Sequence, residues 1–203
     1  NQNPIDFGID VVLHSATKYM GGHSDILAGT AIASEAHIDK IFQLAKNFGG
    51  SLSDFTVWML ERSLKTMGLR VKAQNENALE LARFLEKHGD ISRVYYPGLE
   101  SHPDHELAKS QMKGFGGMMS FELRGGLDFD LFQKKLKLIK SSMSLAGVES
   151  TILSPSKTSH GLLSPEEREA QGIKDGLMRF SVGIEEKEDL MEDLEQALKE
   201  VRG

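Results

Sequence analysis

One lysine near the beginning of the chain stands among side chains that suit the binding of a phosphorylated aldehyde. Lys18 follows the short apolar run Val11–Leu13 and precedes the glycine pair Gly21–Gly22. Side chains two positions apart share one face of a strand, so the hydroxyls of Ser15 and Thr17 can donate hydrogen bonds to one phosphate. A lysine amine in a partly dry site can lose its proton and form a Schiff base with a carbonyl. A lysine that leaves a buried strand is more often simply solvated, so the spacing alone leaves both interpretations open.

A second candidate is an arginine on an alternating strand near the end of the chain. Between Leu177 and Val182, the alternation places Met178 and Phe180 on one face and Arg179 on the other. A guanidinium is a planar fork of donors that can bind a carboxylate at two points. The alternative is a surface arginine on a half-exposed strand, because arginine is mostly exposed in proteins.

Two other groups of residues do not support a binding site. His102, Asp104 and His105 are too few for a metal, which needs three or four converging ligands, and a turn capped by Asp104 explains them better. The glycine-rich residues 114–117 lack the Gly-Lys-Ser/Thr ending of a phosphate loop and precede a strand instead of a helix. We therefore predict no metal site and a tight turn at the glycines.

The residues around Lys18 resemble the cofactor motif of a known enzyme family. Residues 15–19 read Ser-Ala-Thr-Lys-Tyr and residues 21–25 read Gly-Gly-His-Ser-Asp. Both are similar to the pyridoxal-phosphate lysine motif of the enzymes of cysteine and methionine metabolism, the transsulfuration family. This family contains cystathionine synthases and lyases, methionine lyases and homoserine-ester sulfhydrylases. The resemblance continues, in the family's order, through residues 102–108, 114–118, 144–150 and 177–183.

The resemblance implies a cofactor and a role for each candidate residue. It implies that pyridoxal 5'-phosphate is bound to Lys18, which is also the catalytic amine, and that Ser15 and Thr17 anchor the phosphate. It further implies that Arg179 holds the α-carboxylate of an amino-acid substrate, assisted by Ser144. In such enzymes the protein mainly positions the cofactor and the substrate.

The implied reaction is γ-replacement or γ-elimination on cystathionine or an activated homoserine. Cystathionine β-lyase and methionine γ-lyase are the alternatives within the family. Glu149 matches an acid that, in members with γ-chemistry, meets the distal end of a long substrate, although a glutamate after a glycine turn is commonly just solvated. The chain departs from the family at Ala146, where glycine is common, and at residues 154–156, where His-Pro-Ala is common. Both departures lie near the expected substrate entrance, so the resemblance does not decide which of these substrates the protein uses.

The resemblance also implies the architecture, which is an α/β protein of the aspartate-aminotransferase-like fold type I. Residues 1–64 correspond to the end of the large mixed-sheet cofactor domain, and residues 65–203 to a smaller α+β substrate-binding domain. The first residues resemble an internal stretch of the family, so we expect an N-terminal half that would supply the partner of the pyridine nitrogen. A homotetramer is the expected assembly. The alternative to an enzyme is a non-catalytic polypeptide whose role is structural or subunit-forming.

The composition is that of an ordinary soluble chain and excludes several other functions. The sequence has 203 residues, enough for one or two domains, and a net charge of -6, which argues against nucleic acid as a partner. No apolar run approaches the roughly 18 residues of a membrane span, and no secretory signal is visible. The absence of cysteine excludes disulfides and fits a reducing compartment, so we expect a cytoplasmic protein.

The elements expected to position the candidate residues are helices and strands in mixed order. After the strand at 11–13 we expect a buried strand at 27–33 and a helix over 38–45 ended by Gly49–Gly50. A helix capped by Asp54 should break near Gly68 and resume up to Gly89. Further on we expect strands at 94–96, 118–123, 138–144 and 177–182, and helices at 129–138, from Ser164 onward with a capping box, and through Leu190–Leu198.

Overall fold

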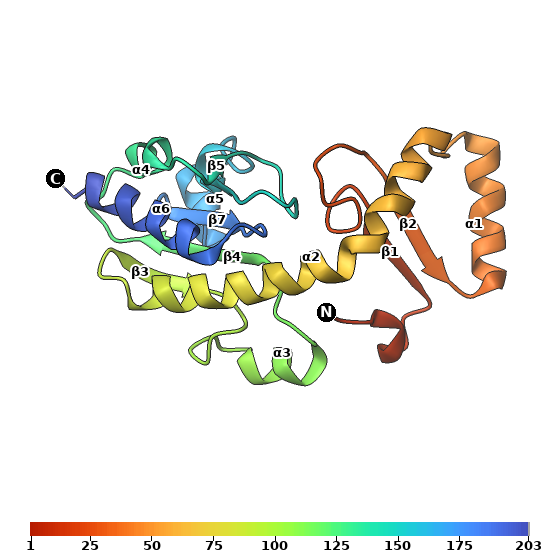
Figure 1. Ribbon diagram of the computed structural model, residues 1–203, viewed down its shortest axis with the longest axis horizontal. Coiled ribbons are helices and arrows are strands. Elements are labelled where there is room, and N and C mark those ends of the chain that lie inside the picture. Colours follow the sequence, from red (N-terminus) through yellow and green to blue (C-terminus); the bar gives the residue numbers. More distant parts are fainter. Residues whose placement is uncertain (203) are drawn as a thin grey trace.

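A single long helix, α2 (Asp54–Lys87), joins the two parts of the molecule in the computed structural model, which describes residues 1–202 (Figure 1). One part holds two strands and a helix, and the other holds a five-stranded sheet with its helices. The first part consists of the 3-10 turn η1 (Pro4–Phe7), β1 (Val11–Ser15), β2 (Gly29–Ala33) and α1 (Glu35–Phe48). No helix within residues 1–202 has the length and apolar character required to cross a membrane.

The N-terminal part contains a small two-stranded sheet whose residues are mostly not buried. Strands β1 and β2 pair antiparallel, with Val11 opposite Ala33. A minor core forms beneath the turn that follows β1, from Ala16, Ile26 and Leu60. The expectation that the second strand is buried is wrong for this structure, because no residue of β2 is buried. The helix end at Gly49 is confirmed, since this residue has the left-handed φ of 75° that glycine readily adopts.

Helix α2 is continuous for 34 residues, so the predicted break at Gly68 is wrong. A single glycine inside a helix costs only about 1 kcal/mol relative to alanine, and packing at both ends of α2 outweighs that. The cap is Ser53, whose hydroxyl accepts a hydrogen bond from the Thr56 N–H at 3.2 Å, and not Asp54. The helix ends at Lys87, slightly before the predicted stop at Gly89.

The continuity of α2 predicts that Gly68→Ala stabilises the protein by about 0.5–1 kcal/mol, because alanine is the better helix former. A methyl group at this position would meet no atom within 4 Å. Chemical denaturation of both proteins measures the difference. Gly49→Ala is the matched control and should destabilise the protein, since Gly49 has equal space but a φ of 75°.

The C-terminal part is a mixed sheet in the order β3-β4-β7-β6-β5, which confirms the mixed α/β class. All neighbouring strands pair antiparallel except β5 and β6, which are parallel. One face of β4 and β7 packs its apolar residues against α2, α4 and α6, with Phe121 and Phe180 fully buried between them. The elements are β3 (Ile91–Tyr95), α3 (His105–Gln111), β4 (Met118–Leu123), α4 (Phe129–Lys135), β5 (Lys140–Ser141), β6 (Thr151–Leu153), η2 (Pro155–Lys157), α5 (Pro165–Ala170), β7 (Leu177–Ser181) and α6 (Lys187–Glu200).

Most of the predicted elements of this part are confirmed, and two are shorter than predicted. Strand β4 has the predicted bounds, and α5 begins with the predicted capping box between Ser164 and Glu167. The helix predicted over 129–138 ends at Lys135, and the strand predicted over 138–144 has only two residues. Asp193 explains the gap between these two elements, because its carboxylate accepts hydrogen bonds from the N–H groups of residues 137–139 and holds them in a bend.

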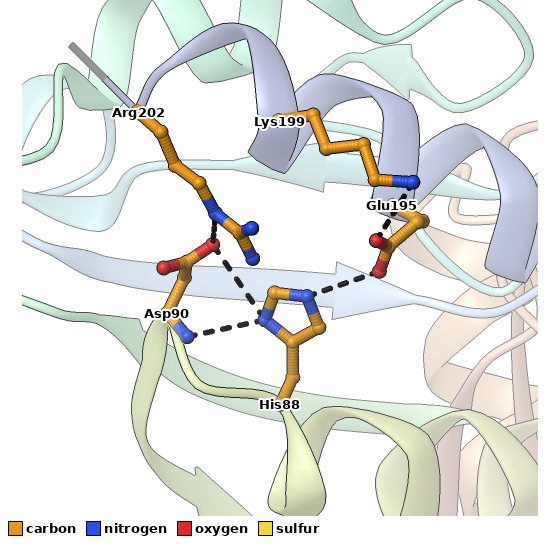
Figure 2. A network of polar contacts seen from close by, with 5 residues as sticks. All are labelled: His88, Asp90, Glu195, Lys199 and Arg202. Carbon is orange, nitrogen blue, oxygen red and sulfur yellow. Dashed lines mark hydrogen bonds and ion pairs between the residues drawn. The ribbon is translucent and has the colours of Figure 1, made fainter.

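A polar network fastens the end of α2 to the end of α6 (Figure 2). His88 Nδ1 accepts a hydrogen bond from the Asp90 N–H at 3.2 Å, so Nε2 carries the proton and donates to Glu195 at 3.0 Å. Lys199 lies 3.0 Å from the other oxygen of Glu195, and Arg202 bonds to Asp90. These contacts fix the far end of α2 relative to the sheet.

The same network predicts a pH dependence of stability. The hydrogen bond from Lys199, and then the neighbouring His88, lower the pKa of Glu195 below the ordinary value of 4.5. A group with a lowered folded-state pKa stabilises the fold above its unfolded pKa and loses that effect as the pH falls through the folded pKa. We therefore expect the free energy of unfolding to fall less steeply below pH 4.5 in Glu195→Gln than in the wild type. Glu192→Gln, an exposed neighbour on α6, should retain the wild-type slope.

Candidate active site

The turn that carries Lys18 is closed by its own backbone. Strand β1 ends at Ser15, whose carbonyl accepts a hydrogen bond from the Lys18 N–H at 3.0 Å. The N–H of Gly21 donates to the carbonyl of Ala16, and the N–H of Gly22 donates to the carbonyl of Lys18, both at 2.7 Å. Since Ala16 is fully buried, the base of the turn is anchored in the minor core, whereas the Lys18 side chain is only partly buried.

Lys18 lines a cavity of about 340 Å³ between the two parts of the molecule. The wall brings a primary amine together with three hydroxyls and one carboxylate. Ser144, predicted from a distant part of the sequence, meets Lys18 here. Ser24 and Asp25 were not predicted as site residues, although they belong to the block that resembles the family. The lining residues are Thr17, Lys18, Ser24, Asp25, Ile26, Leu27, Ser144 and Leu145.

The two hydroxyls predicted to hold a phosphate lie in different surroundings. Because β1 ends at Ser15, the expectation that Ser15 and Thr17 share one strand face is wrong. Ser15 is exposed, whereas the Thr17 hydroxyl accepts a hydrogen bond from the Ala28 N–H at 2.9 Å and donates to the Ala28 carbonyl at 3.3 Å. Thr17 therefore also closes the loop between β1 and β2, and its phosphate role stays a prediction, as does that of Ser15.

The loop after Lys18 contacts the loop between β5 and β6 directly, as these two loops face each other across the middle of Figure 1. The Val148 N–H donates to the Gly22 carbonyl at 3.0 Å, and the hydroxyls of Ser24 and Ser144 lie 3.4 Å apart. From α2, the Gln74 Nε2 donates to the carbonyl of Gly147 at 2.8 Å. The cavity is thus bounded by one loop from each part of the molecule.

Arg179 lies directly behind the Ser144 segment. As predicted, Met178 and Phe180 are buried in the core, and Arg179 is on the opposite face of β7. Its Nη2 donates to the carbonyls of Met143 at 2.9 Å and Ser144 at 3.4 Å. Its Nε is buried without a hydrogen-bond partner within residues 1–202, and burial lowers the pKa of the guanidinium. A buried N–H without a partner is suited to donate a hydrogen bond to a ligand carboxylate.

The loop of residues 144–149 has a strained backbone at its centre. Ala146 is fully buried and has a φ of 67°, and its N–H donates to the Ser181 hydroxyl at 2.8 Å. A left-handed conformation costs an alanine roughly 1–2 kcal/mol, which explains why glycine suits this position. Glu149 is exposed on the same loop and does not line the cavity, so its contact with a substrate stays a prediction.

His102, in the turn before α3, and His105, the first residue of α3, both contact backbone atoms through Nδ1. His102 Nδ1 accepts a hydrogen bond from the Asp104 N–H at 3.2 Å, and His105 Nδ1 lies 2.8 Å from the Pro97 carbonyl. Asp104 is at the cap position of α3, but its side chain makes no capping hydrogen bond. Within residues 1–202, no three His, Cys, Asp or Glu side chains are grouped as metal ligands would be.

Comparison with known proteins identifies the family of the chain. The sequence profile described as Cys/Met metabolism PLP-dependent enzyme matches residues 1–199. Cystathionine gamma-lyase of Bacillus subtilis (strain 168) is 45% identical over 201 residues, which cover 98% of the chain and 53% of that protein. Cystathionine beta-lyase of Lactococcus lactis subsp. cremoris (strain MG1363) is 46% identical over 199 residues, with 98% and 52% covered.

A solved structure shows the same fold. Cystathionine gamma-lyase from Lactobacillus plantarum, complexed with L-serine, superposes with a TM-score of 0.93 at 40% identity and covers 99% of this chain and 53% of that one. The chain therefore belongs to the pyridoxal-phosphate-dependent enzymes of cysteine and methionine metabolism, as the residues around Lys18 suggested. It spans about half the length of the curated relatives that it matches.

Proposed function

We propose that the protein is a transsulfuration enzyme that acts on cystathionine or an activated homoserine by γ-replacement or γ-elimination. The observation that carries this proposal is the cavity in which the amine of Lys18 faces the Ser144 segment, with Arg179 behind it. Arg179 does not line the cavity itself, but a primary amine in a cavity whose far wall is backed by a guanidinium suits an amino-acid substrate.

The cavity fits the cofactor of the family by its donor set. It presents one primary amine and the hydroxyls of Thr17, Ser24 and Ser144. Behind the Ser144 segment, the buried Nε of Arg179 has no hydrogen-bond acceptor within residues 1–202. Pyridoxal phosphate, when bound, supplies an aldehyde for amines and a ring that withdraws electrons from the substrate carbon. Lys18 would hold it, and Ser15 and Thr17 would bind the phosphate.

The remaining steps of the proposed reaction belong to residues of this chain. Arg179 binds the α-carboxylate of the substrate and, with Ser144, fixes the orientation of the bond that breaks. Lys18 Nζ accepts the proton from the substrate Cα and returns protons to the neighbouring carbons. Glu149, at the exposed edge of the same loop, binds the distal end of a long substrate.

We further propose that the N-terminal part binds additional polypeptide, in a homo-oligomer that the family resemblance suggests to be a tetramer. Large apolar side chains are exposed on α1, on the strands and the loop that joins them, and on the first turns of α2, with Leu27, Phe48 and Leu13 at 82%, 84% and 74% exposure. Apolar surface of this extent marks an interaction site. The further half of the family fold and a neighbouring subunit are its proposed occupants, in an enzyme that we expect in the cytoplasm.

The test of the function uses the protein in the full length in which it occurs. Borohydride reduction in the presence of pyridoxal phosphate, followed by peptide mass mapping, should give a pyridoxyl adduct on Lys18. An unmodified Lys18 would oppose the enzymatic function and favour a purely structural role. Incubation with cystathionine then separates the reactions, because γ-cleavage releases 2-oxobutyrate and β-cleavage releases pyruvate.

A β-lyase is the second candidate, since the β-lyase of L. lactis is as similar to the chain as the γ-lyase of B. subtilis. Pyruvate as the only keto acid would establish it. Methionine γ-lyase is distinguished by release of 2-oxobutyrate from methionine. Formation of cystathionine from an activated homoserine and cysteine would establish a synthase.

A further inference from the structure

Arg70 occupies an unusual position beneath the turn that carries Lys18. It lies on α2, is only 4% exposed, and directs its guanidinium at backbone carbonyls. Nη1 donates to the Tyr19 carbonyl at 2.9 Å, and Nη2 donates to the carbonyls of Met20 at 3.3 Å and Ser63 at 2.9 Å. Nε donates to the Thr66 hydroxyl at 3.1 Å. One side chain therefore ties the two residues after Lys18 to the helix.

Stability alone does not explain a charged residue at this place. Within residues 1–202, the ion pairs of the structure do not include Arg70, so the buried charge has dipoles but no carboxylate as partners. Burial lowers the pKa of this guanidinium, which reflects the loss of hydration. Buried charges are expensive, and well-packed apolar residues are often at least as stabilising. A function in positioning gives a reason to keep the arginine.

The second glycine of the pair is fitted to the same guanidinium. Gly22 has a φ of 71°, and a Cβ built on it would lie 1.8 Å from Arg70 Nη1. Its carbonyl accepts the hydrogen bond from Val148, which belongs to the substrate-side loop. Contacts therefore run from α2 through the Lys18 turn to the loop that bears Ser144.

We infer that Arg70 is a positioning residue for Lys18. It fixes the position of the turn that carries Lys18 relative to the loop that carries Ser144. This inference rests on the proposed function, because it concerns the amine that holds the cofactor. Arg70 binds the carbonyls of Tyr19 and Met20, the two residues that follow Lys18. The Lys18 carbonyl itself accepts a hydrogen bond from the Gly22 N–H. Arg70 is not among the residues that line the cavity and acts through this backbone.

The test compares Arg70→Gln and Arg70→Lys with Arg83→Gln in the full-length protein loaded with pyridoxal phosphate. Arg83 lies on the same helix with 53% of its side chain exposed and is the matched control. Arg70→Gln should lower kcat by about a hundredfold, the effect of misplacing a reacting group by about 1 Å, with a much smaller change in KM. It should also lower the fraction of Lys18 trapped by borohydride and shift the pH midpoint of the visible absorption of the bound cofactor. Arg70→Lys should restore part of each loss, whereas Arg83→Gln should behave as the wild type.

A second variant keeps the test decisive if Arg70→Gln does not fold. Gly22→Ala displaces the guanidinium without removing it and should reproduce the loss of kcat and the shift of the pH midpoint. Wild-type values of both in a folded Arg70→Gln or Gly22→Ala protein would overturn the inference. Failure of the proposed function has another signature, since the wild type itself would then form no adduct on Lys18.

Discussion

Lys18→Ala is expected to reduce the activity of the full-length protein by about 10²–10⁴-fold, the effect of losing a positioned proton-transfer group. The side chain lines the cavity, and within residues 1–202 it takes part in none of the ion pairs or side-chain hydrogen bonds of the structure. Its removal should therefore leave the free energy of unfolding within about 0.5 kcal/mol of the wild type. Keto-acid release from cystathionine measures the activity, and thermal unfolding measures the stability.

Two further proteins make this result specific. Lys40→Ala, on the exposed surface of α1, should retain full activity. Lys18→Arg keeps a positive charge but cannot capture an aldehyde in the same way, so it should be as inactive as the alanine variant. Turnover by Lys18→Ala near the wild-type level would refute the role of this amine.

Asp193→Ala should destabilise the protein by about 3 kcal/mol, because one buried carboxylate satisfies three consecutive backbone N–H groups. Oδ1 accepts from Lys137 at 2.8 Å, and Oδ2 accepts from Leu138 at 3.0 Å and Ile139 at 2.8 Å. Alanine would leave these donors without a protein acceptor at the entrance to β5. Urea denaturation followed by fluorescence or circular dichroism measures the change.

The neighbouring positions supply the controls for this prediction. Glu192→Ala removes an exposed carboxylate one residue earlier on α6 and should change stability by less than about 0.5 kcal/mol. Asp193→Asn keeps the shape of the side chain and one acceptor oxygen, so its loss of stability should lie between those of Asp193→Ala and Glu192→Ala. A loss below about 1 kcal/mol in Asp193→Ala would mean that water replaces the carboxylate without difficulty.

Local sequence patterns predicted those elements that local chemistry decides. Helix α5 begins where Ser164 and Glu167 form a capping box, and α1 ends at Phe48 with Gly49 as its cap. The alternation at residues 177–182 placed Arg179 opposite the core, as the structure shows. The errors arose where distant contacts decide. The packing of α2 outweighs Gly68, and Asp193 keeps residues 138 and 139 out of the strand that was predicted before Ser144.

The site was predictable only where the family resemblance named its residues. Lys18 and Ser144 were expected together and do share a cavity, to which Ser24 and Asp25 also belong. Arg70 and Gln74 gave no signal, because polar residues on a helix are usually solvated, and only the fold shows that both are buried against loops. The separation of Ser15 and Thr17 was missed because both residues were expected on one strand face, whereas β1 ends at Ser15 and Thr17 lies in the turn.

The length of α2 has a mechanical consequence for the enzyme. The helix carries Arg70 near its middle and is fastened to α6 by the network around His88, with roughly 27 Å of stiff helix between the two points at 1.5 Å per residue. A tilt of about 5° at the fastened end would move the lysine turn by roughly 2 Å, more than proton transfer tolerates. Substitutions in the C-terminal part that loosen the attachment of α2 to α6 can therefore displace Lys18 and lower activity, although they lie far from the cavity.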